Sequence, residues 1–88
     1  MKNIAVIGAG TMGNGIAHVF AQSGYTVTLI DLSKEALEKA IHTITKNLDR
    51  QLAKEKISAE DKARTLDRIS VNTSMDVGVK GAELIVEA

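Results

Sequence analysis

Short apolar runs alternate with helically spaced apolar residues along the first third of the chain. Ile4 to Ile7 is a continuous branched run closed by Gly8, a pattern typical of a strand buried on both faces. A helix is predicted from Thr11 to about Ser23, followed by a strand from Tyr25 to Ile30 that ends at Asp31. The helix carries apolar residues at helical spacing and a glycine placed to end it: Met12, Ile16, Val19, Phe20 and Gly24.

The middle of the chain predicts a helical hairpin. Ser33 can cap a long helix over about 33 to 56, along which one apolar stripe repeats every three or four residues. Ser58, with Asp61 three residues later, approximates a capping box, so 59 to 67 is predicted as a short antiparallel helix. The stripe consists of Leu37, Ile41, Ile44, Leu48 and Leu52.

The last third returns to strand patterns. Residues 68–72 are predicted as a third strand, 74–79 as a loop or single helical turn, and 83–87 as a fourth strand. Alternating strands and helices predict an α/β fold with right-handed crossovers. We therefore expect the first half of a Rossmann-type, doubly wound parallel sheet of about four strands, with residues 1–88 forming one domain.

A glycine-rich turn joins the first strand to the first helix. The residues Gly8-Ala9-Gly10-Thr11-Met12-Gly13 fit G-x-G-x-x-G, and Asp31 closes the second strand 18 residues after Gly13. Gly8 permits the tight turn, Gly10 lets backbone approach a pyrophosphate, and Gly13 allows close helix packing. The amides around Thr11 to Gly13 would bind the phosphates at the positive end of the helix dipole.

Asp31 indicates which dinucleotide would bind. Its carboxylate would accept hydrogen bonds from the adenosine ribose hydroxyls and would repel the extra phosphate of NADP, so NAD is the expected cofactor. Other interpretations stay open at this point. The glycines could form only a tight turn, and flavin-binding folds and methyltransferases also place an acid after the second strand.

Composition excludes several classes of function. Eleven basic and eleven acidic residues cancel, which argues against nucleic acid or a membrane surface as partner. The absence of cysteine removes disulfides and cysteine-based metal sites and fits a cytoplasmic setting. The first apolar run is too short for a signal peptide or a membrane span. No metal site is predicted.

The stretch from Ile4 through the glycine turn to Gly15-Ile16-Ala17 resembles the amino terminus of the 3-hydroxyacyl-CoA dehydrogenases, particularly the bacterial 3-hydroxybutyryl-CoA dehydrogenases. Asp31, the long hairpin and the segment 82–88 extend the resemblance along the whole chain, which is about the first third of a family member. The resemblance implies an NAD-dependent oxidoreductase that interconverts 3-hydroxyacyl-CoA and 3-oxoacyl-CoA in fatty-acid or butanoate metabolism. It also implies that a carboxyl-terminal substrate and dimerisation domain is absent from this chain.

In the resembled family the hairpin forms part of the CoA-binding surface, and a lysine near the end of its first helix contacts CoA. Lys54 is the matching position by spacing. Independently of the resemblance, Lys46, Arg50 and Lys54 lie four residues apart and form a basic stripe. The stripe fits phosphates of an acyl-CoA substrate, and it equally fits an ordinary solvated helix face.

The residues for the chemical step are missing from the pattern. Hydride transfer from an alcohol needs a base, and the resembled family takes its histidine, glutamate, serine and asparagine from segments after the fourth strand. His18 and His42 are expected to be packing or surface residues, so no catalytic residue is assigned and the chain alone should be inactive. A non-catalytic dinucleotide-binding or regulatory module is the alternative.

The last strand has no covered outer edge, which predicts self-association through it or pairing with the missing half.

Overall fold

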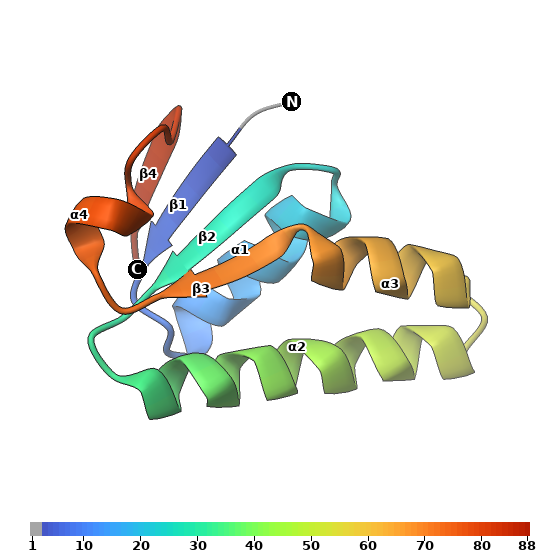
Figure 1. The fold of residues 1–88 in the computed structure, drawn as a ribbon. Coiled ribbons are helices and arrows are strands. Elements are labelled where there is room, and N and C mark those ends of the chain that lie inside the picture. Colours follow the sequence, from blue (N-terminus) through green and yellow to red (C-terminus); the bar gives the residue numbers. More distant parts are fainter. Residues whose placement is uncertain (1–2) are drawn as a thin grey trace.

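The computed structural model describes residues 3–88 and shows one parallel sheet with helices on both faces (Figure 1). The strand order is β3-β2-β1-β4, with every neighbouring pair parallel. This arrangement confirms the predicted Rossmann-type first half. In chain order the elements are β1 (Asn3–Ile7), α1 (Thr11–Gln22), β2 (Thr26–Ile30), α2 (Lys34–Ala53), α3 (Ala59–Asp67), β3 (Ile69–Asn72), α4 (Met75–Gly78) and β4 (Leu84–Glu87).

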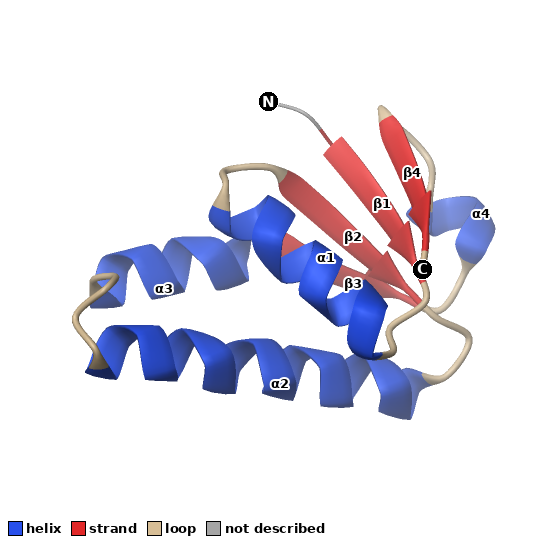
Figure 2. Cartoon of the chain, turned by 180° about the vertical axis from the view of Figure 1, so that it is seen from behind, coloured by secondary structure: helices blue, strands red, loops and turns tan. Residues whose placement is uncertain are grey.

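The path of the chain decides which face each helix covers. From β1 to β3 the chain moves in one direction across the sheet, so α1 and the α2–α3 hairpin lie on one side of it. The chain then returns past β1 to form β4, and a right-handed crossover in that direction places α4 on the opposite face. Figure 2 shows α1 in front of the sheet, the hairpin beside it and α4 behind.

The core lies between the two central strands and the helices packed against them. In β1 and β2 consecutive residues are buried, as expected for strands covered on both faces. Three residues of the predicted apolar stripe of α2 are fully buried, which confirms the orientation of that helix. The main members of this core are Ile4, Val6, Val27, Leu29, Leu37, Ile44 and Leu48.

The first helix forms as predicted, but only half of its apolar repeat, Ile16 and Phe20, packs against the core. Met12 and Val19 are 68% and 65% exposed. The residues that α1 buries against the sheet are instead small, among them Gly13, Ala17 and Ala21. Small side chains let the helix axis approach the strands closely, and Met12 and Val19 are left on its outer flank.

The helical hairpin is shorter than the sequence predicts. Helix α2 ends at Ala53 rather than near residue 56, because Lys54 is its C-cap and Glu55 adopts a left-handed conformation with φ of 59°. The predicted capping box at the start of α3 is present in both directions, between Ser58 and Asp61. Of the two alternatives for residues 74–79, the helical turn is correct and forms α4.

Candidate functional site

The glycine turn and Asp31 meet where β1 and β2 end. The amide of Gly8 donates to the carbonyl oxygen of Ile30 at 2.7 Å, which holds the turn beside the end of β2. The Asp31 carboxylate then accepts hydrogen bonds at both oxygens, from the Ala9 amide at 3.0 Å and from the Ser33 amide at 2.9 Å. The Asp31 side chain therefore lies on the side of the sheet edge that carries the turn.

Two of the three motif glycines are required by the backbone. A Cβ added to Gly13 would lie 1.6 Å from the carbonyl oxygen of Gly8, so only glycine allows α1 to start this close to β1. Gly8 has φ of 105°, a conformation that side chains disfavour. Gly10 is different, because its backbone is ordinary and no atom lies within 4 Å of an added Cβ. Its lack of a side chain leaves space open above the turn.

The amino terminus of α1 has no side chain to cap it. Gly10 occupies the N-cap position and makes no side-chain hydrogen bond, whereas α2, α3 and α4 are each capped by a serine: Ser33, Ser58 and Ser74. The first-turn amides of Thr11, Met12 and Gly13 have no intrahelical partners. At the positive end of the helix dipole, they are a suitable set of donors for an anion.

A groove of about 590 Å³ begins at this helix terminus and runs between α1 and α2. Gly10, Thr11 and Asn14 line one side, and Lys39 and Asn47 belong to the other. Its volume falls within the range of about 300–1,000 Å³ common for small-molecule sites. The sequence analysis did not single out Asn14, Lys39 or Asn47. The available signal is the run of small and polar residues every three or four positions in α2, at 36, 40, 43 and 47.

The surroundings of Asp31 favour its charged form. The Ser33 amide and, second, the Ala9 amide donate to the carboxylate and hold its pKa below the usual value, and partial burial opposes this only weakly. The amide of Ala9 is thus already occupied by Asp31. Among the predicted site residues, Ala9 fixes the position of the acid rather than offering a free donor.

The basic stripe continues the α2 side of the groove. Lys54 is exposed at the C-cap of α2, outside the groove lining, and lies seven residues after Asn47. Seven residues are close to two helical turns, so both residues project from the same face of the helix. Lys46 and Arg50 are also exposed, and Arg50 Nη1 donates to Asn47 Oδ1 at 3.3 Å.

Both histidines are placed away from this site. His18 is 8% exposed on α1, and its Nε2 lies 2.8 Å from Gln22 Oε1, which in turn is linked to Gln51 on α2. His42 is exposed on α2. In residues 3–88 no group of three or more histidine, cysteine, aspartate or glutamate side chains is arranged to hold a metal ion.

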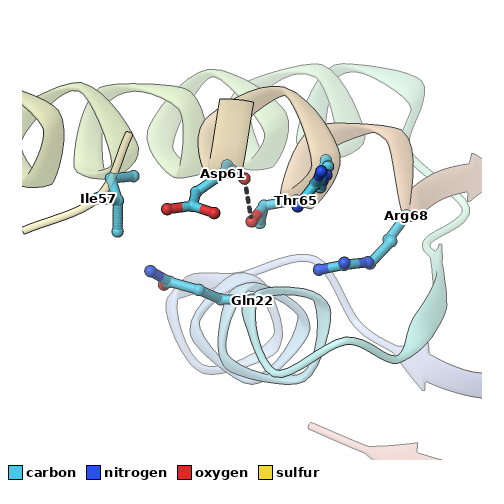
Figure 3. A pocket seen from close by; sticks show the side chains of 6 residues that line it. Gln22, Ile57, Asp61, Thr65 and Arg68 are labelled. Atoms are coloured by element: carbon cyan, nitrogen blue, oxygen red, sulfur yellow. Dashed lines mark hydrogen bonds between the residues drawn. The ribbon is translucent and has the colours of Figure 1, made fainter. Parts of the chain in front are cut away.

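A second polar cavity, of about 260 Å³, lies between the end of α1 and α3 (Figure 3). Its polar side chains make internal contacts. Arg68 Nη1 donates to the carbonyl oxygen of Ala21, and the hydroxyl of Thr65 donates to the carbonyl oxygen of Asp61. Arg68 precedes β3, so this cavity lies at the amino ends of the strands, opposite Asp31. We interpret this cavity as a gap in the packing interface between α1 and the α2–α3 hairpin.

Comparison with known proteins gives a consistent result along the chain. A family model described as the NAD binding domain of 3-hydroxyacyl-CoA dehydrogenase matches residues 3–88. A 3-hydroxybutyryl-CoA dehydrogenase of Bradyrhizobium diazoefficiens is 41% identical over 99% of this chain and 29% of that protein. The mitochondrial hydroxyacyl-coenzyme A dehydrogenase of Sus scrofa is 39% identical over 100% of this chain and 30% of that protein.

A solved structure shows the same fold at similar identity. The (S)-3-hydroxybutyryl-CoA dehydrogenase from Ralstonia eutropha has a TM-score of 0.95 and 41% sequence identity, over 100% of this chain and 31% of that chain. The chain thus spans less than a third of the length of these relatives. Together with the glycine turn, its acid and the sheet order, the matches show that the chain belongs to the 3-hydroxyacyl-CoA dehydrogenase family and corresponds to its NAD-binding domain.

Proposed function

We propose that this chain is the NAD-binding portion of an enzyme that interconverts 3-hydroxyacyl-CoA and 3-oxoacyl-CoA, with 3-hydroxybutyryl-CoA as the expected substrate. The observation that carries the proposal is the pairing of an uncapped helix terminus with an ionised acid 3.0 Å from the amide of Ala9. A diphosphate needs the free amides of the helix terminus, and a ribose needs the acid. Bound NAD would supply the hydride acceptor.

Each residue of the site has a separate task in this proposal. Gly8 and Gly13 shape the turn, and Gly10 leaves room for the diphosphate. The amides of Thr11 and Met12, with that of Gly13, bind its oxygens. Asp31 accepts hydrogen bonds from the ribose with the lone pairs that Ala9 and Ser33 leave available. Its charge favours NAD over NADP.

For the acyl-CoA substrate we propose the face of α2 that lines the groove and ends at Lys54. The groove brings α2 next to the glycine turn, so a ligand on this face lies close to the cofactor. Lys54 supplies an exposed positive charge for a phosphate of CoA at the far end of the face. Arg50 and Lys46 add positive charge along the same helix.

We expect this chain alone to bind NAD without turning over a substrate. A general base must lie within hydrogen-bond reach of the substrate hydroxyl, and both histidines of this chain are placed elsewhere. We propose that the base and the rest of the substrate site belong to the domain that the longer relatives have beyond the matched segment.

We expect the enzyme to be cytoplasmic. In residues 3–88 no helix has the length and apolar character needed to cross a membrane.

Titration of NADH tests the proposal directly. NADH is excited at wavelengths where aromatic side chains do not absorb, so the emission of the reduced cofactor can be followed without protein background. We expect Asp31→Ala to weaken NADH binding by about 10- to 100-fold, the usual value of hydrogen bonds to a charged group. Asp67→Ala is the matched control, because Asp67 is an exposed carboxylate at the end of α3. Equal affinity of wild type and Asp31→Ala would remove Asp31 from the site.

A further inference from the structure

A chain of polar side chains joins α1 to α2 outside the site described above. His18 is 8% exposed, and its Nε2 lies 2.8 Å from Gln22 Oε1. Gln22 Nε2 in turn donates to Gln51 Oε1 at 2.6 Å, and the Gln22 side chain lies between α1 and the hairpin (Figure 3). We call these three residues the amide bridge. Within residues 3–88 no other side-chain hydrogen bond joins these two helices.

The amide bridge has a direction. The oxygen of an amide side chain can only accept, so His18 Nε2 carries the hydrogen in its contact with Gln22. The Gln22 amide group is thereby oriented with its oxygen toward His18 and its nitrogen toward α2. Gln51 Nε2 returns a longer contact of 3.4 Å to Gln22 Oε1. His18 thus orients Gln22, and Gln22 makes the connection between the helices.

The amide bridge lies directly beyond the groove between α1 and α2. The groove is lined by Asn14 on α1 and Asn47 on α2, among others. His18 follows Asn14 by four residues, and Gln51 follows Asn47 by four, so each lies about one turn further along the same helix face. The bridge therefore joins the two walls of the groove at the end away from the glycine turn.

Apolar packing alone would leave the spacing of the two walls less defined. Ala17 and Ala40 are fully buried in the core that α1 and α2 share. Contacts between methyl groups have no preferred direction, so they allow one helix to shift along the other, whereas a hydrogen bond restricts both distance and angle. Without Gln22, His18 and Gln51 would also lose their partners.

We propose that Gln22, oriented by His18 and paired with Gln51, sets the width of the groove and so positions α2 for the acyl-CoA substrate. The inference rests on the proposed function, in which this face of α2 receives the acyl-CoA. The NAD site does not depend on the bridge, because Asp31 is held by two backbone amides and the diphosphate donors belong to the first turn of α1. Gln22 is a positioning residue, which acts through α2 on one ligand and not on the other.

Separate titrations of acetoacetyl-CoA and NADH test this role, at a temperature where thermal melts show every variant folded. We expect Gln22→Leu and Gln51→Leu each to weaken acetoacetyl-CoA binding about 5- to 10-fold, because α2 is then free to shift relative to α1. The double variant should bind no more weakly than either single variant, since both remove the same connection. NADH affinity should equal that of wild type in all three.

Thr45→Ala is the matched control for the loss of a hydrogen bond in α2. Thr45 Oγ1 donates to the carbonyl oxygen of Ile41 at 2.8 Å, a bond that stays within the helix. We expect this variant to bind acetoacetyl-CoA and NADH as wild type does.

A rescue and a distance measurement separate positioning from stability. His18→Gln keeps a side-chain N–H one turn from Gln22 and should retain acetoacetyl-CoA affinity, whereas His18→Leu should lose it as Gln22→Leu does. The chain contains no cysteine, so spin labels at Val19→Cys and His42→Cys, both exposed positions, report the separation of α1 and α2. We expect Gln22→Leu to broaden or shift this distance distribution.

The outcomes distinguish the inference from the proposed function. Equal acetoacetyl-CoA affinities in wild type and Gln22→Leu, or a parallel loss of NADH affinity, would overturn the positioning role. So would a distance distribution that Gln22→Leu leaves unchanged. Failure of wild type to bind acetoacetyl-CoA at all would contradict the proposed substrate face of α2 and the inference with it.

Discussion

Gly13 shows how one hydrogen atom determines the geometry of the site. Its position against the Gly8 carbonyl oxygen leaves no room for a methyl group, since the added carbon would lie 1.6 Å away. Relief of this overlap requires α1 to move away from β1, which would also move the first-turn amides. Gly15, two residues later in the same helix, has no atom within 4 Å of an added Cβ.

The two glycines therefore predict opposite results for the same substitution. Gly13→Ala should destabilise the fold by about 3 kcal/mol or more, as expected when a well-packed contact is overfilled. Gly15→Ala should stabilise it by about 0.5–1 kcal/mol, because alanine favours a helix interior over glycine. Urea unfolding followed by circular dichroism measures both. Equal stabilities would mean that α1 does not pack on β1 at this distance.

Asp31 should make the stability of the fold depend on pH in the acid range. The Ser33 and Ala9 amides stabilise its charged form, so its folded-state pKa lies below the ordinary value of 3.8. This contribution is fully present above the ordinary pKa and is lost as pH falls through the lower, folded-state pKa. In Asp31→Asn the charged contribution is absent at every pH.

The expected measurement is the stability difference between wild type and Asp31→Asn as a function of pH. Wild type should be more stable from neutral pH down to about 4, and the difference should shrink below that. Asp67→Asn serves as the control, being an exposed carboxylate outside the site. A difference that grows as the pH falls below 4 would contradict the assigned hydrogen bonds.

At the scale of elements, local signals predict most of the fold. The buried strands, the serine caps and the turn at Gly24, with φ of 104°, follow from residues that act on their own neighbours. The orientation of α1 does not, because Met12 and Val19 repeat at helical spacing yet face outwards. Ala17 and Ala21 lie on the buried face because α1 packs closely on the sheet and only small side chains fit there. The sequence pattern shows which residues are apolar but does not show that small ones are needed.

The candidate site divides in the same way. The glycine turn and Asp31 form one local motif, so the sequence brings them together. Asn47 and Met75 reach the same region only through the packing of α2 and α4 on the sheet. The spacing of small and polar residues in α2 includes Asn47 but does not show what that face packs against. No short-range pattern marks Met75, because its position depends on contacts between distant parts of the chain.

The capping box of α3 offers a test of one such local signal. Ser58 and Asp61 each accept a hydrogen bond from the backbone amide of the other, which satisfies two amides at the start of the helix. Ser58→Ala should cost about 1 kcal/mol of stability and speed amide exchange chiefly in α3. Ser23→Ala, at an exposed position after α1, should change stability by no more than about 0.5 kcal/mol. Matching losses in the two variants would argue against a specific cap.

For the whole molecule, β4 forms one edge of the sheet. Within residues 3–88, β4 pairs only with β1, and its Leu84 and Ile85 are about half exposed. Helix α1 separately carries an apolar depression of about 480 Å³ lined by Met12, Ile16, Val19 and Phe20 among others.

A second copy of the chain can cover the β4 edge. A two-fold axis perpendicular to the sheet would place two β4 strands antiparallel. Pairing Ile85 with Val86 of the other copy would keep Glu83 and Glu87 from lying opposite each other. The formal net charge of zero adds no overall repulsion between copies.

We therefore expect the 88-residue chain to form dimers through this side. Sedimentation equilibrium should show a concentration-dependent monomer–dimer balance in wild type. Ile85→Lys should shift it strongly to monomer, because it places a charge in the strand-pairing contact. Val71→Lys is the matched control, since Val71 is 47% exposed on the opposite edge strand, β3. A wild type that stays monomeric at every concentration, or that dissociates only on Val71→Lys, would reject dimerisation through β4.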